Sequence, residues 1–300
     1  MGILDDIRRH YRQGGILLRI IYINVGMFLL LHAVALVAWL MGSQAPQALL
    51  WVEVPSRWQV LLTRPWTLLT YCFAHYDVLH ILFNMLWLYW MGRIFLEFFT
   101  PKHLAGLYVL GGIGGALLYV AAYTLLPPLA NENSYLLGAS ASVLAIVVAL
   151  AVYTPDYRIG LLFLGQVALK WVAVVCVLLS VLGIGASNTG GNIAHIGGAL
   201  VGLWFALAIR RGRDITAWLN RSIDWLAGLL RREGRPGRPS VGAPVGGTAW
   251  RPGNRTARHT ATNEPTEADL DRVLEKISRS GYASLTDSER DILFRASRRR

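Results

Sequence analysis

The sequence predicts an all-α polytopic membrane protein, a bundle of six transmembrane helices, from three observations. The 300 residues are 54% hydrophobic and only 16% charged, with a mean hydropathy of +0.42. Six apolar stretches approach the roughly 20 residues that a helix needs to cross the hydrocarbon layer. Residues 210–300 hold +8 of the formal net charge of +11, so the basic, polar part of the chain is its tail.

The six predicted spans follow one another closely, with one exception. They cover residues 20–41, 79–97, 103–126, 136–154, 168–186 and 191–209. The exception is a gap of roughly 37 residues after the first span, which contains Trp51, Trp58 and Trp66 and suits a structured loop at the membrane interface, where aromatic side chains are enriched.

Orientation follows from the Lys and Arg residues beside the spans, because positive charges stay on the cytoplasmic side. Placing the N-terminus inside leaves only Arg57 and Arg64 outside. We therefore expect a multi-pass protein of the cell (inner or plasma) membrane with cytoplasmic N- and C-termini. Spans two, four and six then begin at the outer face. Asp5 and Asp6 argue against a mitochondrial presequence, so we expect the first apolar run to be retained.

Composition divides the chain into a membrane domain and a tail of three parts. We expect a membrane domain at 1–209, a basic amphipathic helix on the inner leaflet at 210–231, a disordered Gly/Pro/Arg linker at 232–264 and a small cytoplasmic helical hairpin at 265–300. In the hairpin, Pro265 opens the first helix and Thr286 to Glu289 form a capping box for the second. Arginines beside such a helix suit anionic membrane lipid, and we expect no nucleic-acid partner.

Four polar residues stand out inside the predicted spans, where polar groups cost free energy and need a partner or a task. His80 and Asn84 are in span two, Ser140 is in span four and His195 is in span six. Each lies a few residues from the outer end of its span. Because a helix rises about 1.5 Å per residue, all four have a similar depth and could meet.

These residue types suit nucleophilic catalysis. Serine needs a base to take its proton, and histidine is the usual base, so Ser140 and His195 fit these roles. His80, the Asn84 amide and the Ser140 N–H could stabilise an oxyanion. Spans four to six contain no carboxylate, so we predict a Ser–His dyad. The only two cysteines lack metal-like spacing, so we expect neither a disulfide framework nor a zinc cluster.

Each residue also has a purely structural interpretation. A serine in a membrane helix often bonds the carbonyl four residues back, and His195 or Asn84 could simply link two spans. Ser142 is a rival nucleophile, but it points about 200° around the helix from Ser140, and we interpret it as a packing residue. We interpret His75 as a hydrogen bonder that anchors a loop. Gly198 and Gly202 share a helix face with His195 and would let spans four and six approach closely.

The chain resembles the rhomboid intramembrane serine proteases over about residues 1–209. The resemblance rests on His75-x4-His80-x3-Asn84, Gly138-Ala-Ser140, Ala194-His195-Ile-Gly-Gly198 and Arg64-Pro-Trp66. It implies a six-span protease in which Ser140 attacks a peptide bond, His195 acts as general base and then acid, and His80 and Asn84 lie on the oxyanion side. The implied substrates are single-span membrane proteins, cut at or near the outer end of the span, without a cofactor or metal.

The sequence departs from the family pattern at two positions. Ala141 follows the serine where glycine is common, and Leu144 stands where some members have an aromatic ring. These changes favour the alternative of a catalytically inactive rhomboid-like protein that binds membrane helices. A third hypothesis, a small transporter, would place its polar groups near the midplane of repeated halves, and this sequence has no internal repeat.

Overall fold

The computed structural model describes residues 15–42, 49–161, 165–230, 267–280, 285–286, 288–289 and 292–293. The chain divides into two compact units, Met1–Arg235 and Pro236–Arg300. The predicted linker at 232–264 lies outside the described residues, as do Asp5 and Asp6.

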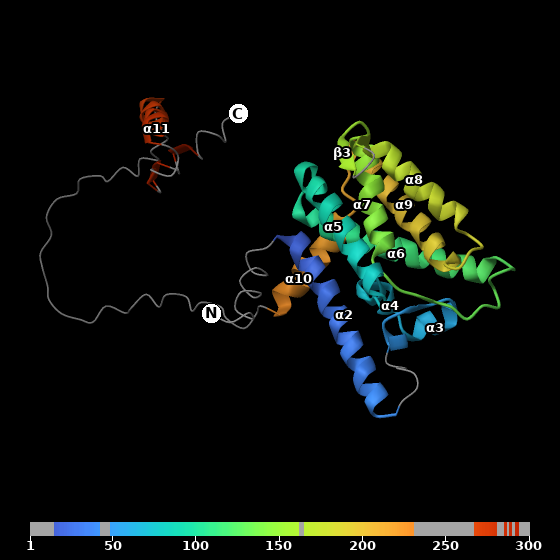
Figure 1. Cartoon of the computed structure of the whole chain (residues 1–300). Helices are drawn as coiled ribbons and strands as arrows, with labels where there is room; N and C mark the ends of the chain where they lie inside the picture. Colours follow the sequence, from blue (N-terminus) through green and yellow to red (C-terminus); the bar gives the residue numbers. More distant parts are fainter. Residues whose placement is uncertain are drawn as a thin grey trace, which may run out of the picture. The chain divides into compact units, whose positions relative to one another are not determined.

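The first unit is a bundle of helices (Figure 1) with two small antiparallel strand pairs. In chain order its elements are α2 (Ile16–Leu40), η1 (Leu49–Trp51), β1 (Val54–Pro55), α3 (Trp58–Thr63), α4 (Thr67–Thr70), η2 (Tyr71–Phe73), α5 (Val78–Phe98), α6 (Pro101–Leu125), β2 (Tyr135–Leu136), α7 (Ser140–Tyr153), β3 (Arg158–Leu161), β4 (Gly165–Ala168), α8 (Leu169–Leu182), α9 (Thr189–Arg210) and α10 (Ala217–Leu230). The prediction of a polytopic helical membrane bundle is confirmed.

Within the described part of the chain, four helices are long and apolar enough to cross a membrane: α2, α5, α6 and α9. Helices α7 and α8, in the fourth and fifth predicted spans, are apolar but have only 14 residues each. The number of spans therefore stays a prediction. The fourth predicted span began at residue 136, whereas Tyr135–Leu136 pair with Val54–Pro55 in an antiparallel bridge. Gly138 then turns the chain with φ +113°, which a right-handed helix cannot contain.

Helix α7 lies at the centre of the bundle. Residues 141–151 are all buried, and the helix packs against α5, α6, α8 and α9. Glycines make this packing close. A side chain on Gly198 would overlap the carbonyl oxygen of Ala141, and one on Gly202 would overlap that of Ala145. The predicted close approach of these two helices through small residues is confirmed.

Residues 49–77, which hold the aromatic side chains between α2 and α5, are structured, as the composition predicted. The indole N–H of Trp66 donates to the carbonyl of Trp51 at 2.9 Å, and the two rings stack with centroids 5.7 Å apart. The Arg64 guanidinium lies 4.5 Å from the centroid of the Trp51 ring. These contacts fold the segment against itself, so it is a compact loop and not an extended linker.

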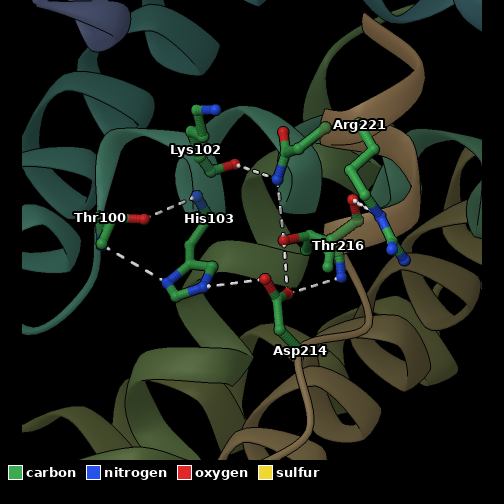
Figure 2. A network of polar contacts seen from close by, with 8 residues as sticks. Thr100, Lys102, His103, Asp214, Thr216 and Arg221 are labelled. Carbon is green, nitrogen blue, oxygen red and sulfur yellow. Dashed lines mark hydrogen bonds and ion pairs between the residues drawn. The ribbon is translucent and has the colours of Figure 1, made fainter. Parts of the chain in front are cut away.

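Helix α10 is tied to the start of α6 by a polar network (Figure 2). The imidazole Nε2 of His103 lies 3.2 Å from a carboxylate oxygen of Asp214, and the other oxygen accepts from the N–H and hydroxyl of Thr216 at 2.7 and 2.6 Å. The Asn220 amide donates to the Lys102 carbonyl at 3.2 Å. Thus the chain after α9 folds back onto α6, while contact of this segment with lipid stays a prediction.

The described part of the second unit contains helix α11 (Glu267–Ser280). The ammonium of Lys276 lies 2.8 Å from both carboxylate oxygens of Glu289. Glu289 also accepts from the backbone N–H of Thr286 at 2.7 Å, which is one half of the predicted capping box.

Candidate active site

Ser140 and His195 are brought together by the packing of α7 against α9. The hydroxyl Oγ of Ser140, the first residue of α7, lies 2.7 Å from the imidazole Nε2 of His195. This is hydrogen-bonding distance, and both side chains are partly buried. A serine and a histidine in this geometry can exchange a proton, which is the arrangement that an activated nucleophile requires.

The turn before α7 fixes the position of Ser140. The N–H of Gly138 donates to the Tyr71 carbonyl at 2.9 Å, and the N–H of Ala139 donates to Nε2 of His75 at 3.3 Å. Gly138 has φ +113°, a region that favours glycine, and a Cβ there would stand 2.7 Å from Cε1 of His80. The backbone of this turn therefore lies directly against the His80 ring.

His80 and Asn84 lie one helical turn apart on α5. The Asn84 amide Nδ2 is 3.1 Å from Nε2 of His75, and both of these residues are buried. The His75 and His80 rings meet edge to face, with centroids 5.0 Å apart. His75 is thus the loop anchor that the sequence suggested: its Nε2 is the shared acceptor for the Ala139 N–H and the Asn84 amide.

Two cavities meet at the Ser140–His195 pair. The larger has a volume of about 990 Å³, is lined mainly by the loops that precede α5, α7 and α9, and includes His80. The smaller, of about 310 Å³, lies between α5, α7, α8 and α9 and includes Asn84. Its apolar lining consists of Phe83, Trp87, Val143, Leu144, Val147 and Leu179. The larger cavity is thus bordered by loops with both polar and apolar side chains, and the smaller one is a mostly apolar space between helices.

The structure adds one residue that the sequence analysis did not single out. Ser180 on α8 is 4% exposed, and its hydroxyl oxygen lies 3.2 Å from Nδ1 of His195. The sequence contained one indication that Ser180 could reach His195. Ser180 lies six residues from the outer end of the predicted span 168–186, at a depth similar to that of His195. A carboxylate is the familiar partner of a catalytic histidine, so the hydroxyl of Ser180 did not stand out in the sequence.

Three other chemically reactive side chains are not part of this pair. Ser142 is fully buried on the face of α7 that meets α6, where its hydroxyl faces Gly112. Cys72 is buried near the same position, while Cys176 lines the smaller cavity. Among the residues that the structure describes, no group of three or more His, Cys, Asp or Glu side chains is placed to hold a metal ion.

The fold and the site define a polytopic helical membrane protein with a Ser–His pair between its helices. Residues 62–212 match the family described as the Rhomboid domain, and this match covers half of the chain. The chain therefore belongs to the rhomboid family. Residues 261–299 match a second family, described only as a family of unknown function (DUF6576).

Curated relatives carry the same family name. The chain is 32% identical over 159 residues to RHOMBOID-like protein 12, mitochondrial, of Arabidopsis thaliana, covering 49% of this chain and 47% of that protein. It is 27% identical over 180 residues to Presenilin-associated rhomboid-like protein A, mitochondrial, of Danio rerio, covering 58% and 44%. The chain thus spans about half the length of these relatives. Their names place them in mitochondria, so the predicted location of this chain and the orientation of its termini stay predictions.

Proposed function

We propose that this protein is an intramembrane serine endopeptidase that cleaves single-span membrane proteins at or near the outer end of their transmembrane segment. The observation that carries the proposal is the 2.7 Å separation between Ser140 Oγ and His195 Nε2 at the junction of two cavities. Membership of the rhomboid family supports the same activity.

The proposed reaction uses the pair in two half-reactions. Nε2 of His195 takes the hydroxyl proton as Ser140 Oγ bonds to the carbonyl carbon of the scissile peptide. The imidazolium then gives this proton to the leaving amine as the C–N bond breaks, which leaves an acyl ester on Ser140. A water molecule, deprotonated by the same nitrogen, hydrolyses the ester and restores the serine.

The oxyanion of the tetrahedral intermediate needs donors that are already in place. The backbone N–H of Ser140 belongs to the first turn of α7, where N–H groups have no acceptor within the helix. We assign the second and third donors to His80 and Asn84, which line the two cavities beside Ser140. The contact between His75 and Asn84 restricts the orientation of the amide.

The partners follow from the same proposal. The substrates are transmembrane proteins, and the smaller, apolar cavity suits a hydrophobic side chain of such a segment. Membrane lipid is the second partner: Trp218 and Trp225 on α10 are more than half exposed and suit an interfacial position. We propose that the protein lies in the inner or plasma membrane with both termini in the cytoplasm. Labelling from each side of the membrane of single cysteines placed near residues 57 and 212 would test this orientation.

Cleavage of a model single-span substrate by the purified full-length protein in proteoliposomes tests the activity. We expect Ser140→Ala and His195→Ala to abolish cleavage, and Ser142→Ala to retain it, because Ser142 faces α6. Wild-type protein that binds several substrates without cutting any would refute the protease activity and favour the inactive helix-binding alternative. Leu144, which lines the smaller cavity together with His195, is the residue that supports this alternative. Loss of cleavage only in Ser142→Ala would refute the assignment of Ser140.

A further inference from the structure

We infer that Ser180 is a positioning residue that holds His195 in the tautomer able to accept a proton from Ser140. The inference deepens the proposed function and rests on it. Ser180 belongs to α8, whereas Ser140 and His195 belong to α7 and α9, so three helices meet at one imidazole ring.

The hydrogen bonds of Ser180 determine which way its lone pairs point. Its hydroxyl donates to the carbonyl of Cys176, one turn back on the same helix, at 2.9 Å. A serine hydroxyl has only one hydrogen, so this bond uses the donor and leaves the oxygen as an acceptor. Nδ1 of His195 lies 3.2 Å from that oxygen. With the hydroxyl hydrogen engaged at the Cys176 carbonyl, Nδ1 carries the hydrogen of the ring and donates it to Ser180.

The position of this hydrogen sets the chemistry at the other side of the ring. A neutral imidazole has one N–H, so a hydrogen on Nδ1 leaves the lone pair of Nε2 free. Nε2 is the atom that faces Ser140 Oγ at 2.7 Å. With the opposite tautomer, Nε2 would present an N–H to Ser140 and could not take its proton. Ser180 thus selects the form of His195 that works as a base.

Ser180 occupies the place that a carboxylate has in a catalytic triad. A carboxylate orients the histidine and also stabilises the imidazolium by its charge. A hydroxyl orients the ring but carries no charge, so its loss should have a much smaller effect. We expect about a tenfold loss of kcat, since one hydrogen bond contributes roughly 1.4 kcal/mol, which is a factor of ten in rate.

A matched pair of variants separates the hydrogen bond from packing. Thr and Val have nearly the same shape, and only Thr keeps a hydroxyl, so Ser180→Thr and Ser180→Val disturb the packing equally. We expect Ser180→Thr to keep kcat within about threefold of the wild type and Ser180→Val to lose about tenfold, with KM unchanged in both. Equal kcat values for the two variants would overturn the inference.

Nitrogen-15 NMR of the imidazole gives a readout that does not depend on cleavage. The full-length protein, labelled with ¹⁵N-imidazole histidine in nanodiscs, should show His195 as the Nδ1–H tautomer, assigned by its disappearance in His195→Gln. Ser180→Val should show a mixture of tautomers. An Nε2–H signal in the wild type would overturn the inference. The wild type could cleave nothing and still show the Nδ1–H form, with that form lost in Ser180→Val. In that case the role of Ser180 in setting the tautomer is supported, and only the proposed protease function fails.

Discussion

Gly198 lies directly against the carbonyl oxygen of Ala141, with no space for a side chain between them. Gly198 is one helical turn after His195, and Ala141 follows Ser140 in the chain. This backbone contact between α9 and α7 therefore sets the distance at which the imidazole and the hydroxyl meet. The geometry of the pair depends on a glycine that takes no part in the chemistry.

Replacing Gly198 with alanine should push the two helices apart. A displacement of about 1 Å at a reacting group can cost about a hundredfold in rate, so we expect Gly198→Ala to lose activity by about this factor and to unfold at a lower temperature. Cleavage rate and thermal unfolding in detergent measure both effects. Gly26→Ala in α2 is the control, because a Cβ there meets nothing within 4 Å. Similar activities for the two variants would contradict the prediction.

Gly138→Ala should also reduce cleavage, for two reasons. Alanine is strained at φ +113°, and its Cβ would collide with the His80 ring 2.7 Å away. Gly165→Ala separates these effects, because Gly165 has φ +70° and open space around its Cβ position. We expect both variants to lose stability through backbone strain of about 1–2 kcal/mol, and only Gly138→Ala to lower kcat strongly. An equal loss of kcat in both would show that contact with His80 is unimportant.

His75→Leu should lower both stability and turnover. The substitution leaves the buried Ala139 N–H and the Asn84 amide without their shared acceptor, which costs roughly 1–3 kcal/mol per group. Chemical denaturation and kcat measure the two effects. His32→Leu is the matched control, because His32 is exposed and its Nδ1 lies 2.9 Å from the Phe28 carbonyl of the same helix. A His75→Leu variant with normal kcat would remove this residue from the support of the site.

Asp214 should stabilise the docking of α10 in a pH-dependent manner. Burial opposes its ionisation, but hydrogen bonds from Thr216 and the contact with His103 outweigh burial and lower the pKa of the carboxyl group. Because the folded pKa lies below the unfolded value of about 3.9, the stabilisation is complete above that value and is lost as the pH falls through the folded pKa.

At neutral pH, Asp214→Asn should therefore lower the hydrogen-exchange protection of the amides in α10. Asp224→Asn is the control. Asp224 forms an ion pair with Lys102, but the two side chains are 59% and 65% exposed, respectively, and exposed ion pairs contribute little to stability. Equal protection factors in Asp214→Asn and the wild type would contradict the prediction.

The sequence was most informative where it was chemically unusual. Ser140 and His195 were recognisable because polar side chains are rare in apolar spans, and the constant rise of a helix gave their depth. The start of α7 was four residues too early in the prediction. The apolar pattern continues through Tyr135 and Leu136, and it does not reveal that Gly138 adopts a positive φ.

Contacts between residues distant in sequence leave no pattern in the sequence from which they could be predicted. His75 was predicted to form hydrogen bonds, but its acceptor role toward Ala139 joins residues 64 positions apart. Ser180 could not be told from a serine that merely bonds its own helix, and it does form that bond with Cys176 as well. Only the packing of α8 against α9 reveals its second contact.

The burial of residues 141–151 separates most of α7, though not Ser140 itself, from the surrounding lipid. Residues 141–151 are buried inside the bundle, and three of them line the smaller cavity, whereas α5 and α8 expose apolar side chains such as Leu82, Leu86, Val174 and Leu178. Acyl-chain length and fluidity therefore act on the walls of the site and not on the helix that carries the serine. A change of bilayer would alter access to Ser140 while its position against α6 and α9 stays fixed.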